Sequence, residues 1–315
     1  MRMQEEFRHE TVLLRESVEG ILGDPDGIYV DCTLGGGGHS AALADRLSPS
    51  GCLVGIDQDP AALQAGRLRL TGVRPTVHVV QGNFREIGAV LDQLGIGQVD
   101  GILFDLGVSS HQIDLPQRGF SYMNNGPLDM RMNPEQSLTA QEIVNTYPEK
   151  ELARVIFEYG EERWARRIAK FIVEARRNRP LTTTFELVEL IAAAIPAAAR
   201  RQGPHPAKRT FQAIRIEVNG ELSILPAALR TAIDRLKPGG KIGVISFHSL
   251  EDRIVKNTFA ALLGHCVCPP KAPVCICNPR ATLRLPGKPI APSAEEVEAN
   301  PRARSAKLRI AEKVG

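Results

Sequence analysis

The 315-residue sequence predicts an α/β protein built on a doubly wound parallel sheet, with a mostly helical domain inserted into the chain. Three observations support this prediction. Glycines at 35–38 join a short apolar strand to a helix, apolar strands alternate with helices as far as residue 105, and this alternation stops there and resumes near residue 210. Strands and helices that alternate at this spacing form parallel sheets, so the interruption predicts an insertion.

The predicted strands are short apolar or β-branched runs, each followed by a turn or a helical pattern. We expect parallel strands at 28–32, 52–57, 77–81, 99–105 and 241–248, and an antiparallel edge pair at 283–290 and 306–311. We expect helices within 7–23, at 41–47, from Pro60, at 84–94 and at 210–236. Pro60 suits a first helical position, whereas Pro226 predicts a break and the Pro-Gly-Gly of 237–240 predicts a turn.

The glycines at 35–38 lie where nucleotide-like ligands bind in such sheets, between a strand and a helix N-terminus. Asp57 closes the second strand about 20 residues later, the position from which a carboxylate holds ribose hydroxyls. Dinucleotides and S-adenosyl-L-methionine both use this arrangement. The third small residue is Ser40, and no Lys-Ser/Thr follows to bind phosphate, so the residues favour the methyl donor. Asp31, at the end of the first strand, suits that donor's cationic amino-acid end.

The composition is that of a soluble globular protein, with 5% aromatic and 24% charged residues. The N-terminal segment 1–10 is too charged for a signal peptide, and the most apolar window, 187–199, is too short to span a bilayer. We therefore expect a cytoplasmic protein that does not contact a membrane. The oligomeric state, monomer or homodimer, is left open.

Positive charge is concentrated in one segment of the chain. The range 163–215 holds twelve Lys and Arg against three acids, whereas the remainder of the chain is net negative. One predicted helix there places basic residues on one face, namely Arg163, Arg166, Arg167, Lys170 and Arg177. A basic segment on an acidic body indicates a polyanionic partner, although a solvated helix face is the simpler alternative.

Four of the six cysteines form a Cys-x-Cys…Cys-x-Cys window, Cys266, Cys268, Cys275 and Cys277. Disulfides are not expected in a reducing compartment. Zinc is an alternative, but structural zinc sites usually space their paired cysteines more widely. We expect no metal.

Seven segments, in order along nearly the whole chain, resemble the bacterial 16S ribosomal RNA (cytosine-N4)-methyltransferases of the MraW/RsmH type. They are 9–14, 31–40 (Asp-Cys-Thr-Leu-Gly-Gly-Gly-Gly-His-Ser), 105–110, 126–132 (Gly-Pro-Leu-Asp-Met-Arg-Met), 205–216, 246–253 (Ser-Phe-His-Ser-Leu-Glu-Asp-Arg) and 300–306.

This resemblance implies a class I, Rossmann-like sheet of the S-adenosylmethionine-dependent methyltransferases. The core would be formed by 1–105 and 207–315, and 106–206 would be an inserted helical domain for substrate recognition. The implied reaction methylates the N4 amine of a cytidine in the decoding centre of 16S rRNA, within the small ribosomal subunit.

The same resemblance implies the ligand-binding residues. Gly37, Gly38 and His39 would line the methionine end of the donor, Asp57 the ribose and Phe84 the adenine, with Asp105 and Gln112 completing the pocket. Residue chemistry agrees for Asp57, a double hydrogen-bond acceptor, and for Phe84, a flat apolar face. His39 has a simpler alternative, since Ser40 or His39 could only cap the following helix.

Asp105 and His248 are the expected catalytic residues. Asp105 ends a strand beside the donor site and would accept a hydrogen bond from the target amine, with His248 as the weaker candidate for taking the proton. Asp105 could instead only order the donor pocket. His248 and Asp252 could be structural, Asp252 through a capping box at 249–252.

Other functions stay open at this stage. A nicotinamide-dependent oxidoreductase is disfavoured by Ser40 and by the basic insertion, and an RNA-binding assembly factor with an inactive methyltransferase fold is disfavoured by the intact Asp57 and Asp105. The aromatic residue that stacks on the target base is also open. The candidates are Phe247, Tyr122 and Phe120, whereas Trp164 is expected in the core.

Overall fold

The computed structural model describes residues 11–201, 203–264 and 280–315. The chain divides into two compact units, a core unit of Met1–Gly107 with Leu222–Gly315, and an inserted unit of Val108–Glu221. The sequence prediction ended the insertion at 206, ahead of α11 (Lys208–Asn219). The structure groups α11 with the inserted unit, because its apolar face packs against α7 (Glu149–Gly160) there.

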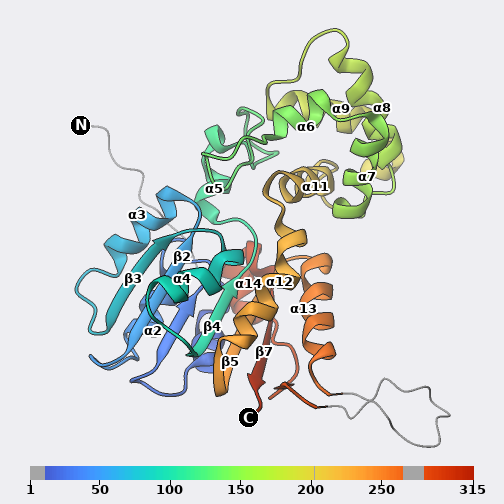
Figure 1. The fold of residues 1–315 in the computed structure, drawn as a ribbon. Helices are drawn as coiled ribbons and strands as arrows, with labels where there is room; N and C mark the ends of the chain where they lie inside the picture. Colours follow the sequence, from blue (N-terminus) through green and yellow to red (C-terminus); the bar gives the residue numbers. More distant parts are fainter. Residues whose placement is uncertain (1–10, 202, 265–279) are drawn as a thin grey trace, which may run out of the picture. The chain divides into compact units, whose positions relative to one another are not determined.

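The core unit is built on one seven-stranded sheet with the strand order β3-β2-β1-β4-β5-β7-β6 (Figure 1). Its first five strands are parallel, and β7 runs antiparallel to both β5 and β6. The strands are β1 (Ile28–Asp31), β2 (Cys52–Asp57), β3 (Thr76–Gln81), β4 (Val99–Asp105), β5 (Leu236–Ser246), β6 (Leu283–Arg284) and β7 (Lys307–Lys313). The predicted α/β class and the Rossmann-like, class I sheet are confirmed.

The strand order reverses between β1 and β4, which are direct neighbours in the sheet. Because β1, β2, β4 and β5 are parallel, their carboxyl ends lie at one edge, where Asp31, Asp57, Asp105 and Ser246 end the four strands. In doubly wound sheets, ligands bind outside the carboxyl ends at such a reversal. The topology therefore brings three acidic residues to the expected binding edge.

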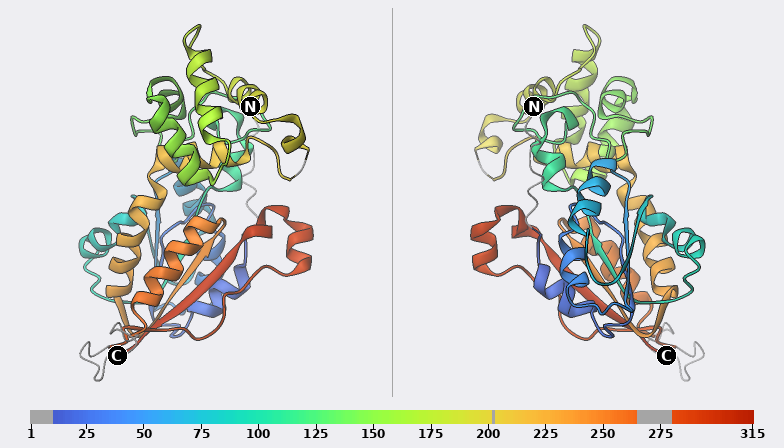
Figure 2. Two further views of the ribbon diagram at one scale, coloured as in Figure 1. Left: turned by 90° about the vertical axis from the view of Figure 1, so that its right-hand side faces the viewer. Right: turned by 90° about the vertical axis from the view of Figure 1, so that its left-hand side faces the viewer.

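Helices cover both faces of the sheet (Figure 1; Figure 2). Alternate residues of each strand point to opposite faces, so Val30 packs in one core cluster and Tyr29 in another. The first cluster includes α4 (Ile87–Gln93), α12 (Glu221–Asp234) and α13 (Ser249–Ala261), and the second includes α1 (Leu14–Ile21), α2 (Gly38–Ala44) and α3 (Pro60–Arg69).

The inserted unit has its own apolar core, formed mainly by helices. The helices are α5 (Ser110–Asp114), α6 (Ala140–Thr146), α7, α8 (Ala165–Arg176), α9 (Thr184–Ala194), α10 (Ala197–Arg200) and α11. Among the residues that the structure describes, no helix is both long and apolar enough to cross a membrane.

Two predictions about local structure were wrong. The segment 237–240 is part of β5 and not a turn. The pairing of β4 with β5 shifts register between Val99 and Gly101, which indicates a β-bulge in this part of β5. Proline and glycine are tolerated at β-bulges as they are in turns, so the sequence pattern was misleading. Pro226 lies inside α12, whose apolar face is buried, and the helix break is instead at Gly220, with φ of 62°.

The carboxylate of Asp100 joins three strands at the opposite end of the sheet from the glycine loop. Its Oδ2 accepts a hydrogen bond from the backbone N–H of Ile28, the first residue of β1, at 2.7 Å. The same oxygen lies 2.8 Å from Nζ of Lys237 in the β5 bulge. One side chain of β4 thus ties β1 and β5 together.

Asp100→Ala should lower the free energy of unfolding by about 1–3 kcal/mol, because it leaves the N–H of Ile28 without its acceptor. Differential scanning calorimetry measures the change. Asp92→Ala is the matched control, since Asp92 is 62% exposed and forms only a surface pair with Arg235, and it should cost less than about 1 kcal/mol. Equal losses in the two variants would contradict the role given to Asp100.

Candidate active site

The glycine loop follows β1 and needs its glycines for its own packing. Gly35 and Gly37 have φ of 51° and 74°, in the left-handed region. A Cβ on Gly37 would lie 3.2 Å from Cα of Gly66, and one on Gly38 would collide with the side chain of Thr11. Gly37 also precedes the first residue of α2. The backbone therefore approaches its neighbours too closely for a side chain at 37 or 38.

Asp31 lies beneath this loop and is only 1% exposed. Its Oδ2 accepts a hydrogen bond from Oγ of Ser40 at 2.8 Å, and its Oδ1 accepts one from the N–H of Thr33 at 3.2 Å. Burial raises the pKa of Asp31 to about 6, against the lowering effect of these hydrogen bonds. Asp31 was expected to face a ligand. It instead holds the two ends of the glycine loop from inside.

Asp57 also contacts the loop, but its carboxylate keeps capacity for a ligand. Oδ2 accepts a hydrogen bond from the N–H of Gly35 at 2.8 Å, and Oδ1 accepts one from the N–H of Asp59 at 2.9 Å. The side chain is partly exposed, and each carboxylate oxygen has a second lone pair. Burial raises the pKa of Asp57 to about 6. The arrangement suits two hydroxyl groups on adjacent carbons.

Phe84 follows β3, next to β2 in the sheet, and begins a short 3₁₀ helix, η1 (Phe84–Glu86). Asn83 caps η1, and its Nδ2 donates to Oε1 of Gln58, the residue after Asp57, at 2.9 Å. The Phe84 ring is partly buried and packs edge-to-face on Phe104, with centroids 5.8 Å apart. Cap and ring contact together fix the orientation of an aromatic face near the end of β2.

Asp105 ends β4 and is held through its backbone and one carboxylate oxygen. Its N–H donates to Oγ1 of Thr33 at 2.6 Å, and Oδ2 lies 3.7 Å from Nδ1 of His39. Oδ1 is buried and has no hydrogen-bond partner among the described residues. Burial, and then the negative charges of Asp31 and Glu251, raise the pKa of Asp105 well above its usual range. A buried acceptor without a partner indicates a site for a donor group.

His248 follows β5 and is the N-cap of α13. Its Nδ1 accepts a hydrogen bond from the N–H of Glu251 at 3.4 Å, and its Nε2 lies 3.1 Å from Oε1 of Glu251. Oε2 of Glu251 in turn accepts from the N–H of Phe247 at 2.8 Å. The predicted capping box at 249–252 is therefore wrong by one residue, because His248 serves as the cap.

Asp252 has a different role from the capping one that was predicted. It accepts hydrogen bonds from Lys307 and Arg309 of β7, at 2.9 Å and 2.6 Å. Although burial raises it, these hydrogen bonds hold the pKa of Asp252 below its ordinary value. Asp252 therefore ties α13 to the edge of the sheet.

Gln112 belongs to the inserted unit, whereas the other predicted ligand residues belong to the core unit. It is 6% exposed, and its Oε1 accepts a hydrogen bond from the N–H of Ser109 at 3.1 Å, within a capping box that begins α5. The structure thus brings Asp57, Phe84, Asp105 and the glycine loop to one sheet edge, and gives Gln112 a capping contact in its own unit.

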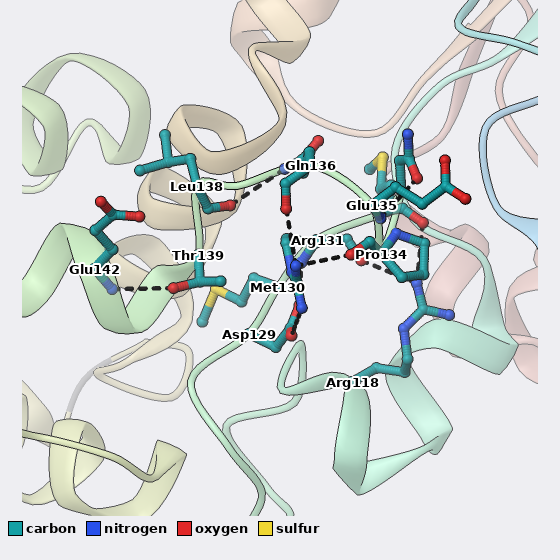
Figure 3. Close-up of polar contacts among 12 residues, drawn as sticks. Arg118, Asp129, Met130, Arg131, Pro134, Glu135, Gln136, Leu138, Thr139 and Glu142 are labelled. Atoms are coloured by element: carbon teal, nitrogen blue, oxygen red, sulfur yellow. Dashed lines mark hydrogen bonds and ion pairs between the residues drawn. The ribbon is translucent and has the colours of Figure 1, made fainter.

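The loop that precedes α6 is ordered by two arginines (Figure 3). Arg131 forms an ion pair with Asp129 at 2.7 Å and donates to the carbonyl oxygens of Pro134 and Gln136. Arg118 donates to the carbonyls of Arg131 and Met132, at 2.9 Å and 3.1 Å. These hydrogen bonds together order the loop.

Within that loop, Met130 is fully buried and has φ of 59°, which is unusual for a residue with a side chain. Its carbonyl oxygen accepts from Nδ2 of Asn219 at 2.8 Å, and its N–H donates to the carbonyl of Arg118 at 3.0 Å. The surrounding contacts therefore hold a strained residue in place.

The basic residues of 163–215 are of two kinds. Arg163 and Arg167 are exposed, and their guanidinium groups lie 5.5 Å from the ring centroids of Trp164 and Phe171, respectively. Arg176, by contrast, donates to the carbonyl oxygens at the end of α6 and is structural. Trp164 is partly buried against the core of the inserted unit. Exposed basic residues lie just before α8 and in its first turns, and others follow along the segment, namely Arg177, Arg179, Arg200, Arg201, Lys208 and Arg209.

Two contributors to the site were missed from the sequence, Thr33 and Glu251. Thr33 contacts both Asp31 and Asp105, and Glu251, 2% exposed, adds negative charge near Asp105. Both lie inside segments that carry the family resemblance, and this position was the only indication in the sequence that they belong to the site. Their roles depend on which strands are neighbours, and a single sequence does not state this.

Metal binding has no support within the described residues. No group of three or more His, Cys, Asp or Glu side chains is arranged there to hold a metal ion. The cysteine window from Cys266 to Cys277 lies outside the residues that the structure describes.

Comparison with known proteins identifies the family. Residues 6–314 match the MraW methylase family. The chain is 55% identical over 311 residues to the ribosomal RNA small subunit methyltransferase H of Heliobacterium mobile, covering 98% of this chain and 100% of that protein. It is 52% identical over 310 residues to the protein of the same name from Clostridioides difficile (strain 630), with coverage of 98% and 100%. The chain belongs to the MraW methylase family.

Proposed function

We propose that this protein transfers the methyl group of S-adenosylmethionine to the exocyclic N4 amine of a cytidine in the decoding centre of 16S rRNA. The coarser part of the proposal, an rRNA methyltransferase of the small subunit, is supported by relatives of that name. The observation that carries the chemistry is the buried Oδ1 of Asp105, which has no partner among the described residues and lies at the end of β4. The protein would act in the cytoplasm, on small ribosomal subunits.

The residues at the sheet edge fit the methyl donor. Asp57 retains a lone pair on each oxygen for the two ribose hydroxyls, and Phe84 offers a supported aromatic face to the adenine. Gly37 and Gly38 would lie at the methionine end of the donor, as the family resemblance implies. The bound donor supplies an activated methyl group on a sulfonium.

Asp105 is proposed to act on the acceptor. The exocyclic amine of cytosine is a poor nucleophile because its lone pair is delocalised into the ring, so the protein must position it and favour its lone pair. A hydrogen bond from the amine to Oδ1 of Asp105 does both. We place His248 second as proton acceptor, since its Nδ1 already accepts the helix-capping hydrogen bond. The target base must first leave its stack.

The aromatic residue that stacks on the target base is proposed to be Phe247. It follows β5 in the core unit and is partly exposed. Tyr122 is already stacked on His205, with centroids 4.7 Å apart, and Phe120 is 8% exposed. Phe247, although it packs against one apolar cluster, is neither fully buried nor stacked on another ring among the described residues.

Donor specificity is tested by isothermal titration calorimetry. The protein should bind S-adenosylmethionine and not NAD, because Asp57 suits a ribose whereas no residue of the loop suits a pyrophosphate. Asp57→Ala should lose about 1.5–3 kcal/mol of donor affinity, the scale of a hydrogen bond to a charged group. Asp26→Ala, at an exposed turn, is the control and should bind normally. Tighter binding of NAD than of the methyl donor would overturn the assignment.

Donor binding should also weaken at low pH. The pKa of Asp57 is raised to about 6, and hydroxyl donors prefer the ionised carboxylate. Affinity should therefore fall as the pH is lowered through 6, by up to about tenfold per pH unit below that value. Asp57→Asn has no carboxylate to titrate, so its affinity should vary much less between pH 7.5 and 5. A parallel decline in both proteins would assign the titration to another group.

The catalytic assignment is tested by single-turnover kinetics on small subunits. Asp105→Asn should retain most of its donor affinity but reduce methyl transfer by about 10²-fold or more, because it removes the carboxylate that accepts the amine proton. Equal losses in donor binding and in transfer would make Asp105 a donor ligand, and the proton-accepting role would then pass to His248.

The basic face of the inserted unit is proposed to bind rRNA phosphates. The double variant Arg163→Glu with Arg167→Glu should weaken binding to small subunits. It should also reduce the slope of log binding constant against log salt concentration, by about 0.9 or less per lost phosphate contact. Lys170→Glu is the comparison, since Nζ of Lys170 already lies 3.7 Å from Glu174, and it should have a smaller effect. Filter-binding measurements across a salt series give both slopes, and an unchanged slope would mean that this face is only solvated.

A further inference from the structure

His39 lies in the first turn of α2, and its ring is almost entirely inside the core unit. The side chain is 4% exposed, and its Nε2 lies 3.1 Å from the carbonyl oxygen of Val12. A carbonyl oxygen can only accept a hydrogen bond, so Nε2 carries a proton in this arrangement. The other nitrogen, Nδ1, faces Oδ2 of Asp105 at 3.7 Å, an ion-pair distance.

The surroundings of Asp105 are otherwise acidic. The carboxyl groups of Asp31, from β1, and Glu251, from α13, both add negative charge near it. Among the described residues, His39 is the only basic group within ion-pair distance of Asp105. Burial beside these carboxyl groups favours the protonated form of Asp105, which could not take a proton from an amine, and a positive charge on His39 would oppose this effect.

We propose that His39 is a positioning residue whose imidazolium, held by the carbonyl of Val12, keeps Asp105 ionised and engages Oδ2 so that Oδ1 is left to the target amine. This inference rests on the proposed function and deepens it. It gives His39 a role toward the target amine, whereas the family resemblance implied a contact with the methyl donor.

The proton balance of the reaction fits this arrangement. The amine lone pair forms the new N–C bond, the electrons of the C–S bond stay with sulfur, and the amine nitrogen loses one proton, which Oδ1 of Asp105 accepts. His39 keeps its proton on Nδ1 throughout. The carboxyl proton passes to solvent when the product leaves, which restores the ionised Asp105.

Two variants separate the contacts of the ring. His39→Gln places an amide N–H near the position of Nε2, so it can keep the contact with Val12 but loses the charge beside Asp105. His39→Asn places an amide N–H near the position of Nδ1, so it can donate to Asp105 but not to Val12. Neither variant carries the positive charge, and only the asparagine retains a donor toward the carboxylate.

The first measurement uses the protein without donor or RNA. The ring signal of His39 is identified in NMR spectra by its loss in His39→Gln, and it is titrated in the wild type and in Asp105→Asn. Removing the negative partner should move the titration of His39 to lower pH by about one unit or more, the scale of a close ion pair. An unchanged titration would overturn the proposal, whatever the enzyme's activity.

The second measurement is single-turnover methyl transfer to small subunits across pH. His39→Gln should bind S-adenosylmethionine as the wild type does but react about tenfold or more slowly, and the acid limb of its pH profile should move to higher pH. His39→Asn should recover part of the rate. Weaker donor binding with an unmoved acid limb would make His39 a donor ligand and overturn the proposal. Wild-type protein that shows the NMR coupling but methylates no subunit would refute the proposed function and leave the His39–Asp105 pair standing.

Discussion

The burial of the Asp31 carboxyl group beneath the glycine loop is the constraint on which the site depends. Ser40 and Thr33 bind its two oxygens, so the end of β1 and the beginning of α2 are fixed by one side chain. Thr33 is thereby placed to hold the backbone of Asp105. The negative charge of Asp31 is also one reason why Asp105 has a raised pKa. A carboxyl group buried beneath the loop thus sets the geometry and the charge of one that is proposed to react.

The topology explains why these acids meet. Parallel strands place their carboxyl ends together, and the reversal between β1 and β4 makes the strands that end in Asp31 and Asp105 direct neighbours. The same packing that brings Asp105 to the site also removes it from water. A basic neighbour, His39, is therefore the natural counterpart of this arrangement, since a buried carboxylate needs a compensating charge.

Much of the fold could be predicted from the sequence, because strand periodicity and the glycine loop are local signals. The range 52–57 became β2 and 99–105 became β4, with the predicted bounds. Prediction failed where tertiary contacts decide. Packing of α12 overrides the helix-breaking tendency of Pro226, the bulge of β5 takes up the residues expected to form a turn, and the partners of Asp252 lie on β7. The orientation of Asp31 could not be predicted either, since a carboxylate at a strand end can face inward or outward.

The most direct test of the account is to locate the methyl group. Small ribosomal subunits that lack the modification are incubated with the protein and isotope-labelled S-adenosylmethionine, and the 16S rRNA is digested and analysed by mass spectrometry. The account predicts one labelled nucleoside, N4-methylated cytidine, from the decoding centre, and labelling about 10²-fold slower or more with Asp105→Asn. Label on carbon 5 of cytosine, on another base, or on no nucleoside at all would contradict it.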